Sequence, residues 1–217
     1  MTVKRPERQR NDPRRERTRR ALMDAALLLM QEVHSFNSIS LREVARHAGV
    51  VPTAFYRHFE DMNALGAALI VESLRTVREE LRGIRNELTP AHLWISQSIS
   101  TFNDYLENNA LALHLLLRER FGANTTLRHA IAQGVELFES ELDTDLARIP
   151  FMQDFSSTDL RMVSSLIVNL VISYAERYLA LSAEQHNEKA RLSKQITKQL
   201  RLAFLGITLW KPTSSIP

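Results

Sequence analysis

The 217-residue sequence contains no cysteine, only six glycines and no long apolar run, and each absence narrows what it can do. Without cysteine there is no disulfide framework, no thiol nucleophile and no thiolate metal site. The longest apolar stretch, residues 166–172, is interrupted by Asn169 and is too short to span a bilayer. No apolar segment follows the basic N-terminus as it would in a cleaved leader. We therefore expect a cytoplasmic protein that does not contact the membrane.

Recognisable catalytic motifs are also missing. The seven histidines are scattered and never form H-E-x-x-H or another metal-ligand spacing. There is no glycine-rich phosphate loop and no G-x-S-x-G turn. Carboxylate pairs such as Glu139 and Asp143 fall on charged helix faces and are more simply solvated. The sequence predicts a protein that is not an enzyme and has no metal site and no cofactor.

Helical periodicity dominates the chain, and no window alternates with period two well enough for a sheet. We expect an all-α fold of nine helices. Their expected ranges are 17–33, two short helices within 40–59, 62–83, 89–108, 111–120, 124–149, 159–181 and 182–210. Asp61, Asn124, Ser156 and the Ser182–Gln185 pair stand where helix N-caps are needed.

Residues 40–59, SLREVARHAGVVPTAFYRHF, have the pattern of two short helices joined by a tight turn. Ser40 and Glu43 form the S-x-x-E capping box that opens the first helix. Gly49 follows that helix where a left-handed residue is needed, and Pro52 suits the first turn of the next. A helix–turn–helix of this kind places its second helix in the major groove of DNA.

The second helix of this segment supplies an aromatic and basic outer face. Phe55 and Phe59, four residues apart, share a face and should pack into a small core. The outer positions are Thr53, Tyr56, Arg57 and His58. A solvated helical hairpin is the alternative, but solubility alone does not require an exposed aromatic. The pattern favours DNA binding.

Charge is concentrated at the N-terminus. Residues 1–20 hold nine Arg or Lys and three Asp or Glu, whereas the whole chain is only +3. An Arg-rich, apolar-poor segment cannot bury a core, so residues 1–16 are predicted to be a disordered basic arm. Such an arm, continuing to Arg17, can follow phosphates or enter the minor groove. A solvated tail that adds only nonspecific attraction is the alternative.

The segment AGVVPTAFYRHFEDMNAL resembles the helix–turn–helix of the tetracycline-repressor (TetR) family, and the expected nine helices extend the resemblance over nearly the whole chain. It implies a homodimer on a palindromic double-stranded operator. By this resemblance Tyr56 and His58 contact phosphates, Thr53 and Arg57 reach base edges, and Ser40 and Arg42 face the DNA backbone. Many members carry a lysine at the start of the fourth helix, where this chain has Met62. The basic arm can substitute for that contact.

A narrower resemblance concerns the ligand. The same segment and LLLRERFGANTTLRHAIAQGV are similar to bacterial repressors of unsaturated fatty acid synthesis, which sense long-chain acyl thioesters. We therefore predict long-chain acyl-CoA as effector and lipid genes as targets. The candidate ligand residues are Phe102, Leu106, Leu113, Leu117, Arg118, Arg120 and Phe138.

Three alternatives stay open for this region. The apolar stripes can be ordinary core, and Arg118 with Glu119 can be a structural ion pair. The protein can also be a TetR-type repressor of an efflux or catabolic gene that answers another small hydrophobic ligand. A drug-like cation would need acidic and aromatic side chains, but this region has more Arg than Glu and few aromatics.

The last two helices carry apolar stripes that predict self-association. Residues 162–175 are apolar on more than one side, so one side is free for a second subunit. The candidate interface residues are Val163, Ile167, Leu170, Tyr174, Ile196, Leu200 and Phe204. The alternative is a monomer with a central core helix. The expected organisation is an arm at 1–16, a DNA-binding domain at 17–62, an effector and dimerisation domain at 63–211, and a tail at 212–217.

Overall fold

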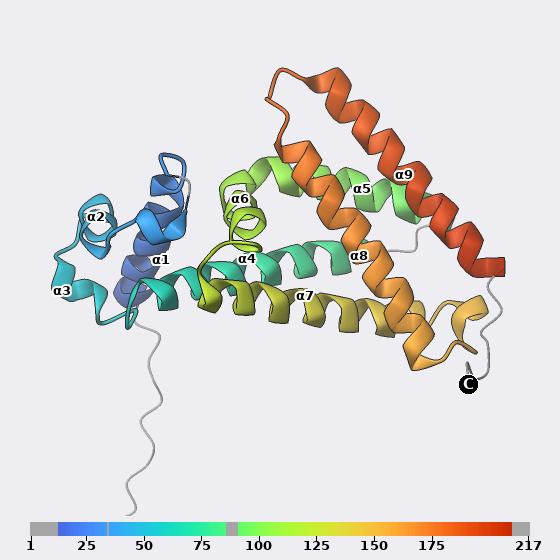
Figure 1. The fold of residues 1–217 in the computed structure, drawn as a ribbon, viewed down its shortest axis with the longest axis horizontal. Coiled ribbons are helices and arrows are strands. Elements are labelled where there is room, and N and C mark those ends of the chain that lie inside the picture. The colour runs from blue at the N-terminus through green and yellow to red at the C-terminus, as the bar shows by residue number, and fades with distance from the viewer. Residues whose placement is uncertain (1–12, 34, 86–90, 210–217) are drawn as a thin grey trace, which may run out of the picture. The chain divides into compact units, whose positions relative to one another are not determined.

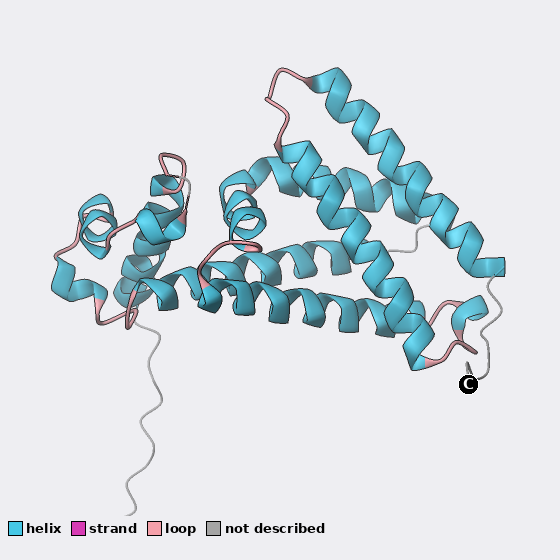
Figure 2. Ribbon diagram, in the orientation of Figure 1, coloured by secondary structure: helices cyan, strands magenta, loops and turns pink. Residues whose placement is uncertain are grey.

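The computed structural model describes residues 13–33, 35–85 and 91–209, and every regular element within them is helical (Figures 1 and 2). The α-helices are α1 Pro13–Leu29, α2 Leu41–His47, α3 Pro52–Phe55, α4 Met62–Arg85, α5 Ala91–Asn108, α6 Ala110–Glu119, α7 Thr125–Leu146, α8 Ser157–Leu179 and α9 His186–Leu209. Short 3₁₀ helices cover Phe36–Ser38 and Pro150–Met152. The all-α prediction with nine helices is confirmed over these ranges.

The chain divides into two compact units, Met1–Leu69 and Ile70–Pro217. The boundary lies inside α4, beyond the predicted position at residue 62. Leu65 and Leu69 are buried in the first turns of α4, which explains why these turns belong to the first unit. The predicted arm was also too long, because α1 already begins at Pro13, a residue that is tolerated in a first helical turn. Residues 1–12 of the arm and the tail at 212–217 lie outside the described residues.

The first unit is built around a small apolar core. Leu22 and Ala26 of α1, Val44 of α2 and Phe55 of α3 are all fully buried. α1 ends at Leu29 rather than at residue 33, and the 3₁₀ turn that follows buries Phe36. These contacts fix α2 and α3 against α1.

The turn that joins α2 to α3 has the predicted geometry. The Ser40 hydroxyl oxygen accepts from the Glu43 backbone N–H at 3.2 Å, and the Ser40 N–H donates to Glu43 Oε2 at 2.9 Å. Gly49 has a φ of 68°, and the N–H groups of Gly49 and Val50 donate to the carbonyls of Arg46 and Ala45. This pair of bonds is a Schellman motif, which needs the left-handed residue that glycine supplies.

The second unit consists of the remainder of α4 and α5 to α9. Helix α8 packs against both α7 and α9, and α9 also packs on α5 (Figure 1). Helix α4 is joined to α7 by ion pairs of Glu141, whose carboxylate oxygens lie 3.5 Å from Arg78 Nε and 3.1 Å from Arg82 Nη2. A further apolar cluster lies where α7, α8 and α9 end or begin, and contains Leu146, Met152, Leu160, Val163 and Ile207.

The helix caps of this unit largely follow the sequence. Asn124 Oδ1 accepts from the Leu127 N–H at 3.1 Å, and the Ser156 hydroxyl oxygen accepts from the Asp159 N–H at 3.1 Å. At α9 only one half of the expected box is present, because the Ser182 N–H donates to Gln185 Oε1 at 2.9 Å and α9 begins at His186. The expected start of α5 at residues 89–90 lies outside the described residues.

Candidate DNA-binding surface and effector cavity

The first candidate site is the outer surface of α2, α3 and the turn after α3. Helix α3 is short, and Tyr56, Arg57 and His58 follow it in a turn. Phe55 is fully buried, whereas its neighbour Tyr56 is 64% exposed and meets the Phe55 ring edge-on at 5.8 Å. Phe55 also packs on Phe59, with ring centroids 5.7 Å apart. The inward phenylalanines therefore fix the outward direction of the tyrosine.

The remaining residues assigned to DNA lie on the same unit but in different settings. Thr53, Arg57 and Arg42 are exposed. The Ser40 hydroxyl donates to Glu43 Oε2 at 2.7 Å and so first serves as the helix cap. These Ser40 bonds also lower the pKa of the Glu43 carboxyl. An ionised Glu43 in the first turn of α2 suits the positive end of the helix dipole.

Helix α1 adds arginines next to this surface. Arg15 Nη2 donates to the Arg57 carbonyl oxygen at 3.5 Å, and the Arg19 guanidinium lies 5.2 Å from the centre of the Phe59 ring. Arg17, the predicted DNA residue, is exposed on the same helix. Sequence reasoning missed Arg15 because it was placed in the arm. Its spacing of four residues from Arg19, on one helical face, was the available signal.

His58 is held in its neutral form. Burial lowers its pKa below the ordinary 6.5, and the positive charges of Arg15, Arg19 and Arg57 lower it further. Within the described part of the chain, its buried Nδ1 has no hydrogen-bond partner. A phosphate contact by His58 near neutral pH would therefore be a hydrogen bond from a neutral ring rather than an ion pair.

The second candidate site is a cavity inside the second unit. It holds about 740 Å³ of space not occupied by atoms, part of it open to solvent. Five helices supply its wall: Leu74, Val77 and Leu81 of α4, Phe102 of α5, Leu113, Leu116 and Leu117 of α6, Ile131, Val135 and Phe138 of α7, and Val168, Val171, Ile172 and Ala175 of α8, with Arg120 directly after α6. Arg120 is the single charged residue in this set. The wall suits a ligand with a long apolar part.

Five of the seven predicted ligand residues line this cavity: Phe102, Leu113, Leu117, Arg120 and Phe138. Leu106 does not, because it is fully buried in the core. Arg118 is exposed instead, since a two-residue step turns a helix by about 200° and separates it from Arg120. The α4 and α8 wall was missed, because a helical stripe shows which residues share a face but not which helices that face meets.

Two weak contacts of the Arg120 guanidinium are seen among the described residues. Its Nη2 donates to Asn169 Oδ1 at 3.4 Å, and its guanidinium lies 5.3 Å from the ring centre of Phe121, which is 82% exposed. Arg128, near the start of α7, donates to the Gly122 carbonyl oxygen at 2.6 Å and does not line the cavity. Among the described residues that line the cavity, Arg120 is therefore the cation that a ligand can reach.

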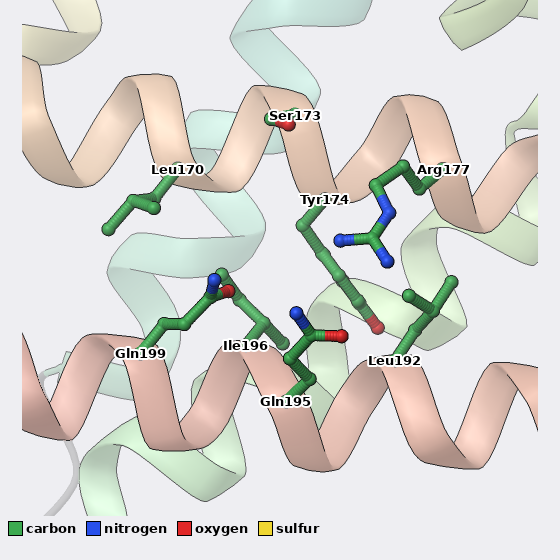
Figure 3. A pocket seen from close by; sticks show the side chains of 8 residues that line it. All are labelled: Leu170, Ser173, Tyr174, Arg177, Leu192, Gln195, Ile196 and Gln199. Atoms are coloured by element: carbon green, nitrogen blue, oxygen red, sulfur yellow. The ribbon is translucent and has the colours of Figure 1, made fainter.

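A smaller groove lies between α8 and α9 (Figure 3). Arg177, Gln195 and Gln199 line it beside the ring of Tyr174. The Tyr174 hydroxyl lies within hydrogen-bonding distance of Asn103 and is 2.9 Å from the Ser193 hydroxyl. Burial raises the pKa of Tyr174, so its hydroxyl keeps its proton.

The residues predicted for the dimer interface line the α8–α9 contact of one protomer. Val163, Tyr174, Ile196 and Leu200 are buried there, and Ile167, Leu170 and Phe204 are partly buried. The large apolar side chains that remain exposed on these two helices are Met162, Leu166, Leu202, Leu205 and Leu209. Each of the two helices therefore keeps apolar side chains exposed in one protomer.

Two properties of the described ranges bear on other functions. Nowhere in residues 13–33, 35–85 and 91–209 do three or more His, Asp or Glu side chains gather as they would around a metal ion. Within the same ranges no helix is both long and apolar enough to cross a membrane.

Comparison with known proteins finds a family match within the first unit and solved structures that share the fold of most of the chain. Residues 22–69 match the model of bacterial regulatory proteins of the tetR family. The fatty acid degradation regulator FadR from Bacillus halodurans superposes with a TM-score of 0.71 at 18% identity, covering 92% of this chain and 96% of that one. FadR from Bacillus subtilis, solved with stearoyl-CoA, gives 0.68 at 18% identity over 83% and 96%. A putative TetR-family regulator from Syntrophomonas wolfei gives 0.73 at 9% identity over 92% and 99%.

The matched residues include α2, the turn at Gly49 and α3, which form the helix–turn–helix described above, and they continue into the first turns of α4. The solved structures extend the likeness to the fold of the second unit. Residues 22–69 therefore form a DNA-binding domain of the kind found in tetR-family regulators, and the all-helical fold of the chain is shared with solved structures of such regulators.

Proposed function

We propose that this protein is a ligand-responsive repressor that binds a palindromic operator as a homodimer and senses a long-chain fatty acyl thioester. The observation that carries the proposal is an apolar cavity with a single lightly held cation, Arg120, in its wall. An acyl chain would fill the apolar part, and Arg120 would bind the thioester carbonyl or a phosphate of the carrier. FadR from Bacillus subtilis, which shares this fold, has been solved in complex with stearoyl-CoA, and that ligand supports the proposed class of effector.

DNA would be bound through the outer surface of the first unit. Tyr56 and His58 are the proposed phosphate contacts, and Thr53 and Arg57 the proposed base contacts. Arg15, Arg17 and Arg42 would add charge around them. Two such units in a dimer would meet half-sites about 34–36 Å apart, one turn of DNA. The exposed leucines of α8 and α9 supply the surface on which a second copy would pack.

The DNA part is tested by binding to fragments upstream of the protein's own gene. If the protein neutralises several DNA phosphates, its affinity for DNA should fall by orders of magnitude as the salt concentration rises from about 50 to 200 mM. Affinity that does not depend on salt, or no binding at low salt, would refute the DNA-binding assignment.

The effector part is tested by titrating the protein–DNA complex with saturated and unsaturated long-chain acyl-CoAs. We expect a change in DNA affinity with acyl-CoA and none with a cationic dye. The reverse result would favour the second candidate, a regulator of efflux genes. Against that candidate, the described residues of the cavity wall include no acidic side chain to hold a cation.

A further inference from the structure

Gly134 stands in the middle of α7, a position where glycine weakens a helix relative to alanine. A Cβ atom at Gly134 would overlap Cδ1 of Leu74 on α4 and would lie 3.4 Å from its Cγ. Gly206 of α9 offers a contrast, because a Cβ there would meet nothing within 4 Å. The Leu74 side chain therefore occupies the space that any side chain at position 134 would need.

This contact is part of the cavity wall. Leu74 lines the cavity from α4, and Ile131 and Val135 line it from the turns of α7 on either side of Gly134. A methyl group at position 134 would have to displace the Leu74 side chain or push the two helices apart.

Helix α4 is held on either side of Leu74, on one side by α7 and on the other by α5. Further along both helices, Arg78 and Arg82 of α4 hold Glu141 of α7 at 3.5 and 3.1 Å. Directly before Leu74, the Tyr105 hydroxyl donates to the Ser73 carbonyl oxygen at 3.1 Å. Because the α4 backbone is held around Leu74 and the tip of a leucine rotates easily, we expect the Leu74 side chain to be the part that moves.

We propose that Gly134 and Leu74 together set the width of the cavity, and that Gly134 is a specificity-determining residue for the ligand. With glycine at 134, Leu74 lies against the α7 backbone and leaves the cavity open to a long unbranched apolar chain. A larger residue at 134 turns Leu74 into the cavity and excludes the longest chains first. The proposal rests on the proposed function only in that the effector occupies this cavity.

The first experiment measures the cavity without a biological ligand. Xenon enters apolar cavities, and it shifts the methyl NMR signals of the leucines around it. Xenon titration of the full-length protein should shift the methyl signals of Leu113 and Leu117 in the wild type. It should shift the same signals clearly less in Gly134→Ala. The Leu74→Ala/Gly134→Ala double variant, which removes the displaced methyls, should regain the shift. Gly206→Ala is the matched control and should behave as wild type.

The second experiment measures affinity for acyl-CoAs of increasing chain length. Gly134→Ala should weaken binding of the acyl-CoA with the longest chain by about tenfold, which is the effect of overpacking by one methyl group. Binding of the acyl-CoA with the shortest chain should be unchanged. Leu74→Ala in the same background should restore the affinity.

Wild-type xenon shifts in Gly134→Ala, or a loss that Leu74→Ala does not relieve, would overturn the proposal. If the wild type binds no acyl-CoA, the proposed effector is wrong, and the xenon comparison still decides whether this pair sets the cavity width.

Discussion

Replacing Arg120 with methionine tests whether the cavity recognises the proposed acyl ligand through this side chain. Methionine keeps much of the length and the apolar contact of arginine but removes the charge in the cavity wall. A hydrogen bond from a charged group contributes about 1.5–3 kcal/mol, so Arg120→Met should weaken acyl-CoA binding by roughly 10- to 150-fold. The apolar part of the wall is unchanged, so binding of a neutral apolar probe should be unaffected.

The stability of the protein should change little in this variant. Arg120 is held by one hydrogen bond of 3.4 Å at an exposed site and by an exposed phenylalanine ring. Losing these contacts should cost no more than about 0.5 kcal/mol. Urea unfolding of the two proteins checks that the change in ligand affinity is not a folding defect.

The matched control is Arg118→Met, on the same segment and with the same change of net charge. Arg118 is exposed and does not line the cavity. Isothermal titration calorimetry with one acyl-CoA should therefore separate the two variants. Equal losses in both would show that only the net charge matters and would refute the role given to Arg120.

Three further predictions concern DNA binding, pH dependence and self-association. Tyr56→Ala should weaken binding to all DNA sequences, whereas Arg57→Ala should also relax base preference; competition between operator and random DNA measures both, and equal behaviour of the two variants contradicts the assignment. The pKa of His58 is lower in the folded chain than its ordinary 6.5, so the unfolded chain binds the imidazole proton more tightly. The stability that the neutral His58 contributes is therefore present above about pH 6.5 and is lost as the pH falls below it. Urea midpoints at pH 7.5 and 5.5 should differ less in His58→Gln than in the wild type, and an unchanged difference argues against a neutral ring at this position. Leu166→Glu, at a half-exposed position on α8, should give a monomer in sedimentation velocity, while a dimer of unchanged strength would place the interface elsewhere.

Local features were predictable because they depend on a few neighbouring residues. The Ser40–Glu43 capping box, the left-handed Gly49 and the Asn124 cap each follow from a short pattern with one geometric solution. The inward Phe55 and outward Tyr56 follow from helical spacing in the same way. Helix ends were less certain, as at α1, which extends to Pro13 at one end and stops at Leu29 at the other.

Tertiary partners were harder to predict because periodicity does not name them. The sequence placed Phe102, Leu113 and Phe138 around a ligand but could not show that α4 and α8 complete the wall. It also could not show that α8 and α9 bury Tyr174 and Ile196 against their own protomer. The contact of Leu74 with Gly134 joins residues far apart in the sequence, and a lone glycine in a helix gives little indication of its partner.

Ligand-controlled DNA binding is the central claim, and one thermodynamic cycle tests it most directly. Operator affinity is measured without acyl-CoA and at saturating acyl-CoA, and acyl-CoA affinity is measured with and without operator. If the two sites are coupled, both pairs of measurements must give the same factor, which we expect to be about 5- to 150-fold. A factor of one, with both ligands bound to the same protein, would contradict the account.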